Sequence, residues 1–185
     1  TLRMTWVAAS SISPKCSTAT NVIRSVSTVF FVIVNSLAAT TGSLVSNLLG
    51  AGQKAQVIPL CNRVVRLGYA IGFPLVILAV IFYRPIVGIY TESTVLMQIA
   101  HLPFVVMLLN YVFALPGYVY MNAVTGIGAT RMTFIFQLIT IVAYQIYLWS
   151  ISGFSTSLSV YWTAEYLYVI LLGLLSVIYL KYKHY

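Results

Sequence analysis

Acidic residues are almost missing from this sequence. Its 185 residues include only two, Glu92 and Glu165, against ten lysines and arginines. Charged residues of both signs make up 6% of the chain, whereas 61% of it is hydrophobic. With a mean hydropathy of +0.97, the chain has too little polar surface to solvate a globular fold in water. The scarcity of charge therefore predicts an integral membrane protein.

The residue combinations that carry enzymatic or metal chemistry are missing as well. Cys16 and Cys61 are far apart, form no CxxC motif and have no nearby histidine, so the sequence predicts no metal or redox site. It contains no GxSG, no HExxH and no paired aspartates, which argues against an enzyme. The net charge of +8 is scattered singly at the ends of apolar runs, which argues against nucleic acid as a partner.

Long apolar runs account for most of the chain. About 20 apolar residues are needed to cross ~30 Å of hydrocarbon. The sequence predicts five membrane-spanning helices, at about residues 20–49, 67–83, 95–122, 132–150 and 160–180. Residues 53–66 carry Lys54, Arg63 and Arg66 and are predicted to form a short amphipathic helix on the membrane surface. The expected fold class is all-α and polytopic.

Small residues indicate where helices approach closely. In the first predicted helix, Ala39, Ser43 and Ser46 are expected to form a face that packs on a partner helix. Gly68 and Gly72 have GxxxG spacing in the second. Proline interrupts the backbone hydrogen bonding of two spans, at positions 74 and 116, and both helices are expected to bend.

The distribution of cations predicts the orientation. Alternating spans place the joint at 50–66, the joint at 126–131 and the C-terminal tail on one side. That side holds six of the ten cations: Lys54, Arg63, Arg66, Arg131, Lys181 and Lys183. Lys15, Arg24 and Arg84 fall on the other side. By the positive-inside rule, the first side and the C-terminus are expected to be cytoplasmic.

Two joints and one connection resemble a known transporter family. The segments SNLLGAGQKAQV (46–57) and AVTGIGATR (123–131) are similar to the two cytoplasmic signatures of the multidrug and toxic compound extrusion (MATE) family, and FYRPIVGIYTESTVLMQIA (82–100) is similar to its connection between the third and fourth helices of a half. The resemblance implies a structural role for six residues of the two signatures: Asn47, Gly50, Gly52, Gly126, Gly128 and Arg131. The features occur in the order and between the spans that the resemblance requires.

The resemblance implies only part of a transporter. Members of this family resemble a pair of six-helix halves, and the five predicted helices here correspond to most of the second half. Residues 18–185 are therefore expected to form the C-terminal helical-bundle lobe of a twelve-helix transporter. Residues 1–17 are expected to be an incomplete N-terminal segment, namely the end of a missing helix and an outer loop. The implied partners are the lipid bilayer, small organic substrates and the missing N-terminal half.

The resemblance implies an integral protein of the bacterial plasma (inner) membrane that carries out secondary active efflux of amphipathic, often cationic, organic compounds. The compounds would be exchanged for protons or sodium ions, with no other cofactor. One alternative is a flippase for lipid-linked saccharides from the wider superfamily, which would favour a more basic cavity. Another is an inactive transporter remnant.

The two acids have different expected roles. Glu92 falls in a predicted outer loop and is expected to be a solvated surface carboxylate. Glu165 lies inside the last span, where an ionisable group is a functional candidate, and it is the candidate for cation coupling. The alternative is a carboxylate that reaches the outer headgroups or bonds to neighbours for packing. Many family members carry carboxylates in the first helix of a half or near the position of Pro116, but this chain has none there. The resemblance therefore assigns an ion-binding role to no residue of this chain.

Uncharged polar residues are candidates to line a substrate cavity. Four recur at helical spacing in the fourth span and form one polar stripe, and four others lie in the first and third spans: Gln137, Thr140, Tyr144 and Tyr147, with Asn35, Asn110, Tyr111 and Tyr118. Their aromatic faces could attract lipophilic cations. The alternative is hydrogen bonding between tightly packed helices. His101, Trp149 and Trp162 are expected to mark the outer interface.

Overall fold

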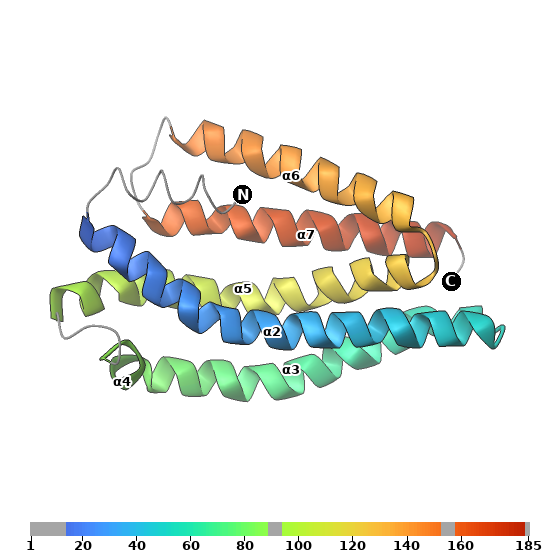
Figure 1. The fold of residues 1–185 in the computed structure, drawn as a ribbon, viewed down its shortest axis with the longest axis horizontal. Helices are drawn as coiled ribbons and strands as arrows, with labels where there is room; N and C mark the ends of the chain where they lie inside the picture. Colours follow the sequence, from blue (N-terminus) through green and yellow to red (C-terminus); the bar gives the residue numbers. More distant parts are fainter. Residues whose placement is uncertain (1–13, 89–93, 153–157, 184–185) are drawn as a thin grey trace.

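The described part of the protein is a bundle of long helices. The computed structural model describes residues 14–88, 94–152 and 158–183. The described elements are α2 (Pro14–Gly50), the 3-10 turn η1 (Lys54–Gln56), α3 (Val57–Ile81), the short α4 (Tyr83–Gly88), α5 (Thr94–Gly126), α6 (Thr130–Ser152) and α7 (Leu158–Tyr182). The long helices lie side by side along one direction (Figure 1). Five of them contain segments long and apolar enough to cross a membrane, which confirms the all-α, polytopic class.

Helix α5 is the centre of the bundle. It packs most extensively against α2 and α7 and also contacts α3 and α6. Its side chains Leu115, Val119 and Val124 are fully buried. The outward faces of α3 and α6 are exposed and apolar: Leu67, Ile71, Ile77, Phe134, Leu138 and Val142. Such faces suit contact with lipid, since hydrocarbon favours apolar surface.

The prediction of a separate surface helix at residues 53–66 is wrong. Apart from the η1 turn, this segment is the first part of α3, which runs without interruption from Val57 to Ile81 and continues through Pro74. Pro59 does not end the helix because it stands in the first turn, where a backbone N–H has no intrahelical partner anyway. Arg63 and Arg66 are exposed within a few turns of the helix start, so their charged ends can reach the interface.

Glycines in the left-handed conformation form the joints between helix pairs. Gly52 follows α2 with φ 75°, and Gly128 precedes α6 with φ 82°, a conformation that glycine adopts without steric cost. Both joints lie at the end of the bundle where α7 also ends (Figure 1). The predicted alternation of the spans requires this arrangement, while the side of the membrane that this end faces stays a prediction.

The backbones of α2 and α5 touch where Gly42 meets Gly126. A Cβ atom at Gly126 would lie 2.5 Å from the carbonyl oxygen of Gly42, and one at Gly42 would lie 3.2 Å from the carbonyl oxygen of Asn122. Ser46 Oγ donates a hydrogen bond of 2.8 Å to the Gly126 carbonyl. These contacts hold the two helices together at the end of the bundle that carries the joints.

The packing face of α2 is rotated from the expected one. Ala39 and Ser43 are exposed, whereas Ser46 of the predicted face donates a hydrogen bond to α5. The small residues that share the contact face are Ala38, which is fully buried, and Gly42. The sequence of α2 is rich in small residues on more than one face, so small-residue spacing alone does not identify the face that packs.

A tyrosine of α3 satisfies a carbonyl that a proline leaves free in α5. Pro116 has no N–H group, so the Val112 carbonyl four residues earlier lacks its intrahelical donor. Tyr69 Oη donates a hydrogen bond of 2.5 Å to that oxygen. The bond fixes α3 against α5 at the proline.

A second tyrosine hydrogen bond joins the same two helices in the opposite direction. Tyr111 Oη of α5 donates a hydrogen bond of 2.9 Å to the Gly68 carbonyl of α3. Its ring lies over Gly72, where a Cβ atom would be 2.1 Å from the ring. The GxxxG pair therefore makes room for a tyrosine of the neighbouring helix.

Gly126→Ala should destabilise the protein by about 2 kcal/mol, because the added methyl group meets the backbone of α2, which cannot rotate away. Thermal unfolding in detergent micelles measures this effect. Gly50→Ala is the matched control: a Cβ atom there meets nothing within 4 Å, and alanine favours a helix over glycine, so its unfolding temperature should equal or exceed that of the wild type. Equal unfolding temperatures for both variants would contradict the α2–α5 contact.

Tyr69→Phe should cost about 1 kcal/mol, since it leaves the partly buried Val112 carbonyl without a donor. The same unfolding assay tests it, with Tyr182→Phe at an 82% exposed position as the control. The explanation fails if both tyrosine variants unfold at the wild-type temperature.

Candidate functional site

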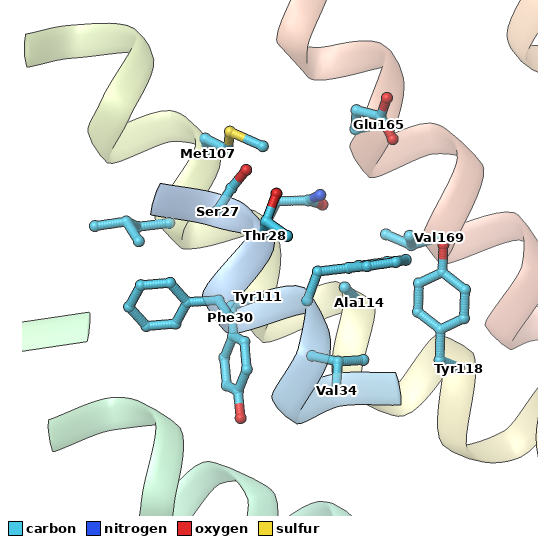
Figure 2. Close-up of a pocket in the computed structure, with 13 residues that line it drawn as sticks. Ser27, Thr28, Phe30, Val34, Met107, Tyr111, Ala114, Tyr118, Glu165 and Val169 are labelled. Atoms are coloured by element: carbon cyan, nitrogen blue, oxygen red, sulfur yellow. The ribbon is translucent and has the colours of Figure 1, made fainter. Parts of the chain in front are cut away.

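A cavity of about 260 Å³ lies between α2, α5 and α7. Figure 2 shows the side chains that surround it. The described residues that line it belong to these three helices: Ser27, Thr28, Phe30, Phe31, Val34, Met107, Leu108, Asn110, Tyr111, Ala114, Tyr118, Glu165 and Val169. The part of each helix that lines it lies away from the end that carries the glycine joints (Figure 1).

Glu165 brings a carboxylate from α7 to this cavity. Its side chain is half-buried, and none of the described side chains that line the cavity belongs to a lysine, arginine or histidine. Tyr144 Oη of α6 donates a long hydrogen bond of 3.5 Å to Glu165 Oε1. Among the described lining residues the cavity therefore holds one acid and no basic residue. A tyrosine from a neighbouring helix restricts the orientation of the Glu165 side chain.

The position of Glu165 depends on a close crossing of α5 and α7. A Cβ atom at Gly117 would lie 2.7 Å from the Val169 carbonyl oxygen, and one at Gly173 would lie 3.1 Å from the Cα atom of Gly117. Glu165 precedes Val169 by one helical turn, so the two share a face of α7. The glycines of the crossing thus place the carboxylate beside α5.

The side chain of Asn110 adds to the cavity a carbonyl oxygen that accepts no hydrogen bond from the described residues. Its Oδ1 atom is buried and has no hydrogen-bond partner in the described part of the chain. Leaving a buried polar atom unpaired costs about 1–3 kcal/mol. Because Asn110 lines the cavity, a ligand in the cavity could satisfy this oxygen.

Aromatic rings form much of the remaining wall. Phe31 of α2 meets Tyr118 of α5 edge to face, with ring centroids 5.6 Å apart. Phe30 and Tyr111 form a second such pair at 6.1 Å. Ring faces attract organic cations through their quadrupole. The cavity therefore combines one carboxylate, an amide oxygen and aromatic surface.

The predicted polar stripe of α6 does not line this cavity. Thr140 is fully buried and bonds back to the Phe136 carbonyl at 2.9 Å. Gln137 donates to the sulfur of Met121 at 3.4 Å, and the hydroxyl of Tyr147 lies 3.0 Å from that of Thr163. With Tyr144 bound to Glu165, the stripe supplies hydrogen bonds to α5 and α7, which is the alternative that the sequence left open.

Of the other predicted lining residues, Asn110, Tyr111 and Tyr118 do meet at the cavity, whereas Asn35 is exposed on α2 outside it. Asn35 belongs to an exposed, mostly polar face of α2: Asn35, Ser36, Thr40, Ser43 and Asn47. Such a face is costly against lipid and suits water or another protein.

The α2 part of the cavity was missed from the sequence. Ser27, Phe30, Phe31 and Val34 have the spacing i, i+3, i+4, i+7, so they share one helix face. This spacing could have been recognised, but nothing in it indicates which neighbour the face meets.

The remaining predicted residues lie outside the cavity. Glu92 and the side chain of Trp162 lie outside the described residues. His101 is exposed and packs edge-on against Tyr83, with ring centroids 4.9 Å apart, and Trp149 is 82% exposed. The motif residues lie at the two joints, where Arg131 is exposed at the start of α6.

The family comparison agrees with this architecture. The MatE family model matches residues 2–150, which include both glycine joints and all three segments that carry the resemblance. No curated protein and no solved structure matches the chain. Glu165 lies beyond the matched residues, so its placement in a site rests on the structure alone. Because the match covers most of the chain, the protein belongs to the MatE family of membrane transporters.

Proposed function

We propose that this chain is the C-terminal lobe of a secondary efflux transporter that exports amphipathic, cationic organic compounds in exchange for protons or sodium ions. The observation that carries the proposal is the carboxylate of Glu165 at the cavity between α2, α5 and α7. A carboxylate within a membrane span is costly unless it is used or paired, and none of the described residues that line this cavity is a cation that could pair with it.

The chemistry of the cavity favours a cation as the substrate. The carboxylate and the aromatic pairs attract positive charge, and the described lining residues include no lysine or arginine to bind the pyrophosphate of a lipid-linked saccharide. Efflux of cations is therefore favoured over the flippase alternative. Sites for drug-sized ligands usually measure about 300–1,000 Å³. A cavity of about 260 Å³ suits the charged part of such a compound rather than the whole molecule.

A single carboxylate supports exchange by competition. Glu165 neutralises one positive charge at a time, whether this is a proton, a sodium ion or the organic cation. The unpaired oxygen of Asn110 would serve as a second ligand for a metal ion or as an acceptor for a substrate donor. Release of one cation then favours binding of the other, and this coupling is what an antiporter requires.

The exposed faces support a second lobe. Transport by alternating access moves one repeat against another, so a second repeat is needed. We propose that the part of the polar face of α2 from Asn35 to Ser43 lines the path between the lobes, while the apolar outer faces of α3 and α6 contact lipid. We place the end that carries the joints, and the C-terminus, in the cytoplasm of a bacterial cell with the chain in its inner membrane, since six cations belong to that end.

Glu165→Gln in the complete transporter should reduce efflux of a monocationic dye such as ethidium at least tenfold, because the amide keeps the shape of the side chain but cannot carry the charge. Dye efflux from loaded, efflux-deficient cells measures the rate at matched expression. Glu92→Gln removes the other acidic residue of this chain and should leave the rate unchanged. An efflux rate equal to that of the wild type in Glu165→Gln would show that this carboxylate takes no part in transport.

Tyr144→Phe should raise the dye concentration that gives half-maximal transport by roughly threefold, because the hydrogen bond that it removes from the carboxylate is long and therefore weak. The maximal rate should change less, because Tyr144 positions the carboxylate and does not line the cavity. Tyr147→Phe, one turn along α6 and bonded to Thr163 instead, is the matched control. If the two variants weaken transport equally, loss of α6–α7 packing explains both effects.

A further inference from the structure

A second groove lies at the end of the bundle that carries the glycine joints. It measures about 340 Å³ and lies where α2 ends and α3 begins. Its lining residues come from these two helices and the connection between them: Leu44, Asn47, Leu48, Ala51, Gln56, Pro59, Leu60 and Arg63. It shares no lining residue with the Glu165 cavity.

The groove is amphipathic. Leu44, Leu48 and Leu60 supply apolar surface, whereas Asn47 and Arg63 supply an amide and a positive charge. A ligand that fits both must itself have an apolar part and an anionic or polar part. A soluble anion would leave the leucines against water.

The charge around the groove is positive, and no acidic residue in the described part of the chain lies beside it. Arg63 is exposed, Arg66 lies about one turn further along α3, and Lys54 precedes the helix. The single acid in the described part of the chain is Glu165, which lines the other cavity. An anionic ligand is therefore favoured at this end.

The start of α3 adds to this preference. Gln56 is the N-cap residue of α3 and lines the groove, and its side chain makes no capping hydrogen bond. The N-terminus of a helix carries a partial positive charge that favours anions. The Gln56 amide and the Arg63 guanidinium thus offer donors to the same space.

We propose that this groove binds the phosphate headgroup of an anionic phospholipid. Arg63 binds the phosphate, with Gln56 and Asn47 as polar neighbours, and an acyl chain packs along Leu44 and Leu48. A lipid fits better than a soluble anion because the exposed outer face of α3 continues from the groove as apolar surface at Leu67 and Ile71. The site does not depend on the proposed efflux function, since it uses none of the residues of the Glu165 cavity.

The test is native mass spectrometry of the complete protein, purified in detergent and titrated with phosphatidylglycerol or with phosphatidylcholine of the same chain length. We expect tighter binding of phosphatidylglycerol. Arg63→Gln should weaken that binding about fivefold, the effect expected for one surface cation. Arg131→Gln, which removes a cation from the same end but not from the groove, should weaken it less than twofold.

A second variant tests the groove without changing charge. Ala51→Trp at an exposed lining position should fill the groove and weaken phosphatidylglycerol binding as strongly as Arg63→Gln. Equal effects of Arg63→Gln and Arg131→Gln would overturn the proposal, because the affinity would then follow the total charge of this end. Displacement of the lipid by millimolar inorganic phosphate would also overturn it, since the site would then recognise the headgroup alone.

Discussion

The close approach of α5 to its neighbours is the constraint on which the rest of the bundle depends. Its backbone meets α2 at Gly126 and α7 at Gly117, where the space for a side chain is already occupied by backbone atoms of the partner. In a lipid environment helices associate through such packing and through interhelical hydrogen bonds, because burial of apolar surface offers little driving force there. The tyrosines that cross between α3 and α5 add the hydrogen bonds.

The site is a consequence of this packing. The contact at Gly117 fixes Val169 and, one turn away, Glu165 against α5, so that the carboxylate shares a cavity with Asn110 and Tyr118. Pro116 stands beside the same contact, and its missing hydrogen bond is replaced by Tyr69 from α3. A displacement of α5 would therefore change the hydrogen bonding of α3 and the surroundings of Glu165 together. This mechanical link is suited to a transporter in which cation binding and helix movement must be coupled.

The sequence predicted the helices well and their contacts less well. The spans follow from run length, because a membrane helix must be about 20 apolar residues long, and Glu165 stood out as a lone acid inside one of them. The segment 53–66 was misassigned because amphipathic spacing is the same in a surface helix and in the end of a spanning helix. The polar stripe of α6 bonds to α5 and α7 rather than lining the cavity, and spacing alone cannot distinguish these two environments.

The central claim, that Glu165 binds the transported cation, is tested most directly by chemical labelling. The complete transporter in membranes is treated with dicyclohexylcarbodiimide, which modifies carboxyl groups in apolar surroundings, with and without the lipophilic cation tetraphenylphosphonium. Mass spectrometry of the peptide that contains residue 165 measures the extent of modification. The account predicts that Glu165 is modified and that the cation reduces its modification in proportion to its occupancy. Equal modification with and without saturating cation would contradict the account.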